Sequence, residues 1–407
     1  MGKDTVVKKD SLPDVEPYFE DIVYCSLLVP VRGNPNSPDC MWGLPCIFWG
    51  LSGIAKTGRI ELGAAKAGLH CEVVYPATKQ PEDFSGVLVP GPKGITIECM
   101  MPAIRKLMEV GSGVLVIDEA SCAPPAVQGA AMSTVYERKV GDMKMSNNIR
   151  ILLAANPPEH AAGGWALEAA FANRMAHFNI GVMPVDKWGE YLMSEDDDVA
   201  VTPITNGEDL VKKNWNRHWA AVKGSLYAFM RSNNSVFHSQ PAPGSPAAGL
   251  PWPSPRTWYM AGRAIATVRC LGLPKQLETI LVQGLVGEGA STEWAAWEAD
   301  ADLPDPLDVL EKGWKVDSKR LDRSIAVCGS FTALVVGTTD KSERVRLAAL
   351  AWERLFDMTE AGLTDIAGIA VKILINKKLG RKDHVSLEAV AAKVVLKVGL
   401  SDASKYL

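Results

Sequence analysis

The chain has 407 residues, of which 47% are hydrophobic and 22% charged, and its formal net charge is −4. This length is enough for two or three domains, and this composition excludes a mainly disordered chain. The acidic balance also excludes an overall basic field of the kind that attracts nucleic acid or an anionic membrane.

No stretch has the run of about 20 apolar residues that a membrane-spanning helix needs. The longest apolar run near the N-terminus, Ile22–Val31, is interrupted by Ser26 and Pro30, and the opening MGKDTVVKKD lacks the apolar core of a signal peptide. The eight Cys and six His show no metal-ligand spacing. We therefore expect a cytoplasmic protein that does not insert into membranes.

The first half alternates short apolar runs with helical patterns. Runs of strand length lie at Pro45–Trp49, Cys71–Tyr75, Val114–Ile117 and Ile149–Ala155. Such runs are typical of parallel strands buried on both faces, and their alternation with helices predicts an α/β sheet. Two hairpins are expected between the strands, one at Val87–Ile97 around the turn PGPKG and one at Val140–Ile149.

The second half is predicted to be mostly helical. The acidic, turn-rich segment Ser194–Asp209 predicts a domain boundary, and Gln240–Pro255, with six Pro, predicts a loop. We expect three parts: an α/β domain at 1–195, a helical lid at 196–310 and a helical C-terminal region at 311–407. Helical spacing recurs at Leu210–Arg231, Thr257–Leu271, Leu277–Val286, Ala290–Ala299, Arg344–Leu355 and Ser386–Val398.

The sequence GLSGIAKTG directly follows the first predicted strand. It fits the phosphate-loop pattern GxxxxGK[ST], except that Ala55 stands at the second Gly. Backbone N–H groups of such a loop surround phosphate oxygens at a helix N-terminus; the alternative is a chance Gly-rich turn. Lys56 would neutralise the β- and γ-phosphates, and Thr57 would ligate Mg²⁺. The candidate nucleotide-binding residues are Gly50, Ser52, Gly53, Ile54, Ala55, Lys56, Thr57 and Gly58.

Two carboxylates follow the third predicted strand. Asp118 and Glu119 end the run GVLVIDE, and the carboxyl edge of a parallel sheet is where α/β proteins place ligands. We expect Asp118 to hold Mg²⁺ through its water shell and Glu119 to polarise an attacking water. An exposed acidic pair at a turn is the alternative.

These motifs together resemble the AAA+ ATPases of the MoxR-like group, which includes dynein-related and midasin-type modules. The likeness covers about residues 40–270, and Ala at the second Gly position is frequent in that group. It lies in GIAKT, in DFSG (83–86), in VIDEASCAPPAVQGAAMSTVYERKV (116–140), in LLAANP (152–157), in ANRMAHF (172–178) and in PSPR (253–256).

The resemblance implies roles for three further residues. Asn156 would be the polar residue of the sensor 1 strand and align water with Glu119, although it is equally suited to satisfying buried backbone. Arg174 would be an arginine finger that reaches a neighbouring subunit's nucleotide, and Arg256 would act from the lid as sensor 2; ordinary surface arginines are the alternative.

Arg256 also has an argument of its own. Ser254 suits an N-cap and Pro255 the first helical position, which puts Arg256 in the first turn. A cation there opposes the helix dipole, by about 0.3–1 kcal/mol, and an anion at that helix end would remove the conflict.

The resemblance implies a P-loop AAA+ sheet with helices on both faces and a homo-oligomeric ring, with a hexamer favoured and Mg-ATP bound between subunits. It also implies work on a protein partner, such as a von Willebrand factor A-type protein. We expect the two hairpins to face that partner or the pore through Val89, Ile95, Met143 and Met145. A non-hydrolysing, nucleotide-gated scaffold and a nucleic-acid-directed NTPase remain as alternatives.

Overall fold

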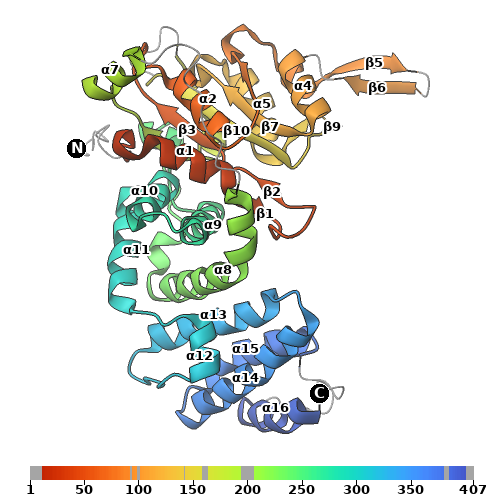
Figure 1. The fold of residues 1–407 in the computed structure, drawn as a ribbon, viewed down its shortest axis with the longest axis vertical. Coiled ribbons are helices and arrows are strands. Elements are labelled where there is room, and N and C mark those ends of the chain that lie inside the picture. The colour runs from red at the N-terminus through yellow and green to blue at the C-terminus, as the bar shows by residue number, and fades with distance from the viewer. Residues whose placement is uncertain are drawn as a thin grey trace. The chain divides into compact units, whose positions relative to one another are not determined.

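Five parallel strands form the central sheet, in the order β11-β3-β10-β7-β4 (Figure 1). The computed structural model describes residues 12–91, 94–98, 101–141, 143–157, 164–193, 206–379 and 385–399. The strands are β3 (Cys46–Trp49), β4 (Cys71–Val74), β7 (Ser112–Ile117), β10 (Asn148–Ala155) and β11 (Ala176–Asn179). Four of these five are the strands that the apolar runs predict.

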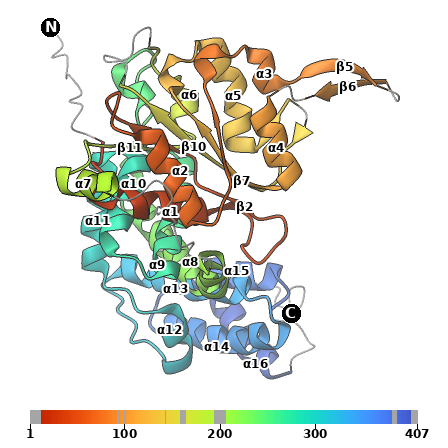
Figure 2. The same ribbon diagram turned by 45° about the horizontal axis from the view of Figure 1, so that its top comes forward.

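The direction of the crossovers places helices on both faces of this sheet. From β3 the chain crosses to β4 at the far edge, and from there each step returns the other way, through β7 and β10 to β11. Because parallel crossovers are right-handed, the helix after β3 lies on one face and those after β4, β7 and β10 lie on the other (Figure 2). The predicted fold class, a parallel sheet with helices on both faces and a helical C-terminal region, is confirmed. The helices of this part are α1 (Phe19–Leu28), α2 (Lys56–Lys66), α3 (Pro81–Ser85), α4 (Pro102–Val110), α5 (Pro125–Glu137), α6 (Ala169–Ala172) and α7 (Val185–Met193).

The chain forms two compact units. The first holds residues 1–212 and 237–292, and the second holds 213–236 and 293–407. The first unit therefore includes α9 (Pro255–Leu271) and α10 (Lys275–Val286), while α8 (Gly207–Ser232) and α11 (Glu288–Ala301) contribute to both. The sequence-based division into three parts, with boundaries near 195 and 310, differs from these two compact units and stays a prediction. Most of the acidic segment at that first boundary lies outside the described residues.

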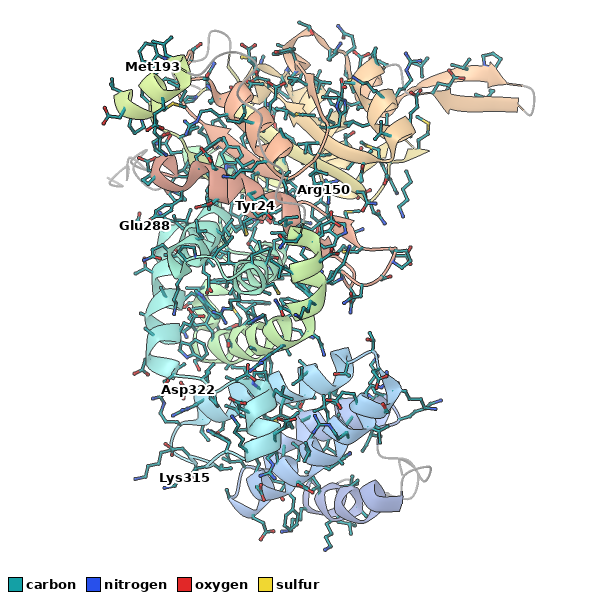
Figure 3. The ribbon with its side chains drawn as sticks, in the orientation of Figure 1. Tyr24, Arg150, Met193, Glu288, Lys315 and Asp322 are labelled. Atoms are coloured by element: carbon teal, nitrogen blue, oxygen red, sulfur yellow. The ribbon has the colours of Figure 1, made fainter. Side chains whose placement is uncertain are left out.

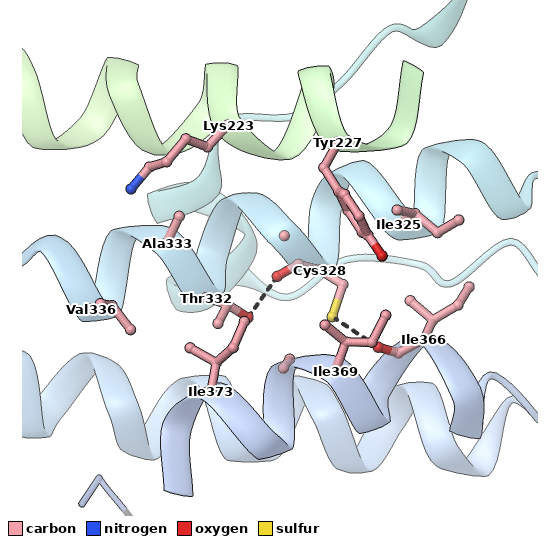
Figure 4. Close-up of a pocket in the computed structure, with 12 residues that line it drawn as sticks. Lys223, Tyr227, Ile325, Cys328, Thr332, Ala333, Val336, Ile366, Ile369 and Ile373 are labelled. Carbon is pink, nitrogen blue, oxygen red and sulfur yellow. Dashed lines mark hydrogen bonds between the residues drawn. The ribbon is translucent and has the colours of Figure 1, made fainter. Parts of the chain in front are cut away.

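The second unit is a bundle of helices around a core that includes the fully buried Trp352. Gly224 of α8 and Gly329 of α13 let the two helices cross closely, since a Cβ at Gly224 would meet Ser330 at 2.1 Å. A mainly apolar groove of about 330 Å³ is lined by residues of α8, α13 and α15, Cys328 among them (Figure 4). Besides α8 and α11, its helices are α12 (Pro306–Lys312), α13 (Leu321–Gly337), α14 (Lys341–Glu360), α15 (Thr364–Asn376) and α16 (Val385–Lys397).

The fifth strand, β11, is absent from the sequence-based prediction because its sequence, AHFN, contains a polar residue. His177 is fully buried, accepts a hydrogen bond from Trp49 Nε1 (3.2 Å) and donates one to the Ala172 carbonyl (3.0 Å). Burial lowers the pKa of His177 to about 4, which keeps the ring neutral. A neutral, fully paired imidazole can therefore occupy a buried strand.

The two predicted hairpins differ in exposure. β5 (Val87–Gly91) and β6 (Gly94–Glu98) form a ribbon that extends away from the sheet in Figure 1, with Leu88 66% and Ile95 74% exposed. β8 (Lys139–Val140) and β9 (Met143–Lys144) form only a short pair. Met145 beside it is 1% exposed and packs into the core, so the prediction that Met145 faces a partner is wrong.

Buried arginines fix the amino-terminal edge of the sheet. Arg138 donates to the carbonyl of Ile149 (2.8 Å), at the start of β10, and to that of Gly43 (2.9 Å), three residues before β3. Arg150 pairs with Glu208 at the start of α8, and Figure 3 labels it among the side chains. A short pair, β1 (Pro30–Arg32) and β2 (Met41–Trp42), lies beside this edge. No helix of the described residues is long and apolar enough to cross a membrane.

Candidate functional site

The loop between β3 and α2 is a tight turn whose N–H groups are free to bind an anion. Gly53 (φ +82°) and Ala55 (φ +60°) are left-handed, and α2 begins at Lys56. In the described part of the chain, no backbone hydrogen bond is found for the N–H groups of Ser52, Gly53, Ala55 and Lys56. Glycine adopts this left-handed conformation without strain, whereas in alanine it costs about 1 kcal/mol or more. Ala55 therefore differs from the glycine of the phosphate-loop pattern in residue type but has the backbone conformation that a glycine there would adopt.

Lys56 is held over this turn by three oxygens. Its side chain is 8% exposed, and Nζ donates to the carbonyls of Gly50 (3.0 Å) and Leu51 (2.8 Å) and to Asn156 Oδ1 (2.8 Å). Burial lowers the pKa of Lys56, while the nearby Asp118 and Glu119 oppose that shift. The ammonium is thus positioned where the loop N–H groups would meet an oxyanion.

Thr57 and Asp118 meet across the sheet edge. Thr57 Oγ1 donates to Asp118 Oδ2 at 2.5 Å, and the Glu119 N–H donates to Asp118 Oδ1 at 2.8 Å. A hydroxyl and a carboxylate are hard oxygen donors of the kind that Mg²⁺ prefers. The Glu119 side chain is exposed, on a left-handed backbone (φ +54°) directly after β7. Asp118 is therefore engaged, whereas Glu119 presents its carboxylate to solvent.

The topology explains why these residues converge. β3 and β10 are neighbours, but the loops that leave their carboxyl ends run to opposite faces of the sheet. Such a switch point is where α/β sheets bind ligands. The predicted phosphate loop follows β3, and Asn156 follows β10, where Ser121 donates to its carbonyl (2.8 Å). The carboxyl edge of the sheet thus brings together the predicted loop residues and three further side chains, those of Asp118, Glu119 and Asn156.

The two predicted arginines lie together at a different place. Ser254 caps α9 as predicted, by accepting a hydrogen bond from Thr257 N (3.2 Å), and Pro255 is the first helical residue. Ser254 also donates to Asn173 Oδ1 (2.9 Å), which ties the start of α9 to the segment before β11. Arg174 and Arg256 consequently share the ring of Tyr136, with Cζ atoms 5.7 and 5.3 Å from its centroid.

This arginine pair belongs to the amino-terminal edge of the sheet, opposite the phosphate loop. Arg174 precedes β11, and the N–H of Ala176 bonds to the carbonyl of Pro45 before β3. From Pro45 to Gly50 the strand advances about 16 Å, at about 3.3 Å per residue. The structure therefore does not bring Arg256 to the phosphate loop of its own chain, as action from a lid on that chain's nucleotide would require.

Sequence reasoning does not identify Tyr136, Arg32 or Asn173. Arg32 Cζ lies 5.7 Å from the centroid of the Tyr136 ring, so three arginines surround one aromatic side chain. Arg32, Tyr136, Arg174 and Arg256 lie on four segments far apart in the sequence, and no spacing rule links them. Only the position of Asn173 could have indicated its importance, because it directly precedes Arg174 in the segment ANRMAHF.

The residues present fit Mg-ATP. The unpartnered loop N–H groups and the buried ammonium of Lys56 suit a polyphosphate, and the Thr57–Asp118 oxygen pair suits a magnesium ion beside it.

No protein-family model matches the chain, and no curated protein matches its sequence. Among solved structures, it is similar to one from Cytophaga hutchinsonii described as a "putative ATPase", with 13% identity and a TM-score of 0.45 over 77% of this chain and 89% of that chain. At this identity, residue roles are inferred from this chain's own geometry.

Proposed function

We propose that the chain is an ATP-hydrolysing AAA+ subunit of the MoxR-like type. The observation that carries this proposal is the convergence of Lys56, Thr57, Asp118 and Asn156 on a turn of unpartnered N–H groups at the start of α2. Each supplies a group that phosphoryl transfer from ATP to water requires: a cation, oxygen ligands for magnesium, and an amide beside the reacting phosphate.

The residues divide the chemistry among themselves. Lys56 would bind the β- and γ-phosphates, and Thr57 with Asp118 would hold a magnesium ion, whose charge would offset the negative charge that develops on the phosphoryl group. Glu119 accepts a proton from the attacking water, since its carboxylate is exposed beside an already engaged Asp118. Asn156 orients the water or the γ-phosphate, and its contact with Lys56 holds it in place.

The arginine pair supports a ring of identical subunits. Because Arg174 and Arg256 lie at the edge opposite their own phosphate loop, they act on a nucleotide only if a second copy presents it. A head-to-tail interface joins the amino edge of one subunit to the carboxyl edge of the next, and closed repetition of it gives a ring, for which we favour six subunits. ATP then lies between subunits.

The test of this function is the effect of Lys56→Ala on nucleotide binding. The variant removes the only ammonium held over the loop by described residues and should weaken binding of a fluorescent ATP analogue at least 100-fold, with the circular dichroism spectrum retained. Lys106→Ala, an exposed lysine on α4, is the matched control and should bind like the parent. Equal affinity in Lys56→Ala and the parent would contradict the loop assignment.

We further propose that the β5–β6 ribbon contacts a protein substrate, such as a von Willebrand factor A-type partner. Leu88 and Ile95 are large, apolar and exposed, and the ribbon contributes no group to nucleotide chemistry. Exposed apolar side chains gathered on one element are typical of protein-binding surfaces.

Replacing Leu88 and Ile95 by Ser should leave basal ATP hydrolysis within about two-fold, because surface changes cost under about 0.5 kcal/mol. Stimulation of hydrolysis by a reduced and alkylated, permanently unfolded polypeptide should fall at least five-fold, since the apolar contact is removed. Val110→Ser, an exposed apolar residue at the end of α4, serves as control. A parallel fall of basal and stimulated rates would instead assign the ribbon to assembly or catalysis.

A further inference from the structure

Three guanidinium groups surround the ring of Tyr136. Arg32 ends β1, Arg174 precedes β11 and Arg256 lies in the first turn of α9, with Cζ atoms 5.7, 5.7 and 5.3 Å from the ring centroid. Each lies within the distance at which an arginine is attracted to an aromatic face. One tyrosine at the end of α5 therefore gathers three cations from distant parts of the sequence.

The carboxylates of Glu137 and Asp39 are nearby, but neither forms an ion pair with these cations in the described part of the chain. No ion pair is found for Arg32, Arg174 or Arg256 among the residues that the structure describes. Burial and the charge of Arg256 lower the pKa of Arg174, while Tyr136 and Glu137 oppose that shift. Three like charges held around one ring, with no carboxylate paired to any of them among the described residues, favour an oxyanion between them. Several other arginines of the described residues are paired with a carboxylate, as in Arg59–Glu16, Arg150–Glu208, Arg217–Asp305 and Arg269–Glu278.

The cluster is built by the fold rather than by flexible side chains meeting at a surface. Arg263, a buried residue of α9, donates to the carbonyls of Pro30 and Gly33 on either side of Arg32. The cap residue Ser254 of the same helix is bonded to Asn173, next to Arg174. Helix α9 thus carries Arg256 and also fixes the backbone that carries the other two arginines.

We propose that Arg32, Arg174 and Arg256 form a single oxyanion site organised by Tyr136, and that its ligand is the triphosphate of the nucleotide held by a neighbouring copy. The inference rests on the proposed function and adds Arg32 as a third binding residue and Tyr136 as a positioning residue. Planar guanidinium groups bind phosphate oxygens in pairs, so three of them match the several oxygens of a triphosphate.

The first test measures turnover. Arg32→Gln should lower kcat at least ten-fold without changing the affinity of isolated subunits for ATP, since their own loops are intact. Arg32→Lys should recover only part of that loss, because an ammonium lacks the planar fork. Tyr136→Leu should be impaired at least ten-fold more than Tyr136→Phe, which keeps the aromatic face. Arg105→Gln, an exposed arginine on α4, is the matched control and should stay within two-fold.

The second test measures the anion site without catalysis. In the Lys56→Ala background, calorimetric titration with inorganic tripolyphosphate should still show binding, and adding Arg32→Gln should weaken it at least ten-fold. Loss of all tripolyphosphate binding in Lys56→Ala, or no effect of Arg32→Gln in both tests, would overturn the inference. A parent chain that neither binds nor hydrolyses ATP would overturn the proposed function, and the titration would still decide whether the arginines bind an oxyanion.

Discussion

Replacing Arg174 by alanine is expected to reduce steady-state ATP hydrolysis by about 10³- to 10⁵-fold, the range measured for arginine fingers in phosphoryl transfer. Arg174 is half-buried, its guanidinium donates to the Ala170 carbonyl, and it lies over the Tyr136 ring. Its orientation is therefore fixed before any nucleotide arrives. Because it lies at the edge opposite its own loop, the loss should appear in turnover and not in the ATP affinity of separate subunits.

Mixing two inactive variants checks whether Arg174 acts between subunits. Arg174→Ala and Lys56→Ala are each expected to be inactive alone. Co-assembled rings should recover measurable turnover at interfaces where an intact loop meets an intact Arg174, with mixing verified by two affinity tags. Arg105→Ala should hydrolyse ATP like the parent. Absence of recovery in rings shown to be mixed would contradict action between subunits.

Replacing Glu119 by glutamine is expected to lower turnover by about 10²- to 10⁴-fold, the usual contribution of a general base. The substitution keeps size and shape but removes the proton acceptor. Asp118 keeps its hydrogen bonds from Thr57 and from the residue-119 N–H, so ATP affinity should remain close to that of the parent. The variant should therefore bind ATP and hold it.

Single-turnover hydrolysis and equilibrium binding on the same preparation separate these effects. Glu109→Gln, an exposed glutamate on α4, is the matched control and should leave both quantities unchanged. Turnover by Glu119→Gln at the parent rate would place the general base elsewhere. A loss of ATP affinity equal to the loss of turnover would instead indicate that Glu119 supports the magnesium site.

Features built from neighbouring residues could be predicted from the sequence. The strand, loop and helix around Lys56 follow one another without interruption, so apolar runs and turn residues suffice to identify them. The cap of α9 depends on Ser254 and Thr257, three residues apart, and was likewise predictable in position. By contrast, the sequence pattern does not predict helices α13 and α15. Both bury residues on much of their circumference, which weakens the apolar periodicity by which a helix is identified.

The sequence by itself determined the α/β class, the strand–turn–helix around Lys56, the acidic pair after β7 and the helical second half, because such patterns depend on residues a few positions apart. Only the tertiary structure decided that β11 joins the sheet through the His177–Trp49 pair, that Met145 is buried, and that Arg256 lies with Arg174 and Arg32 at the edge away from the loop. Those outcomes depend on contacts between segments up to more than 200 residues apart, such as Arg263 with Pro30 and Gly33. The packing of distant segments determines these three features, and no local sequence pattern indicates which distant segments will pack together.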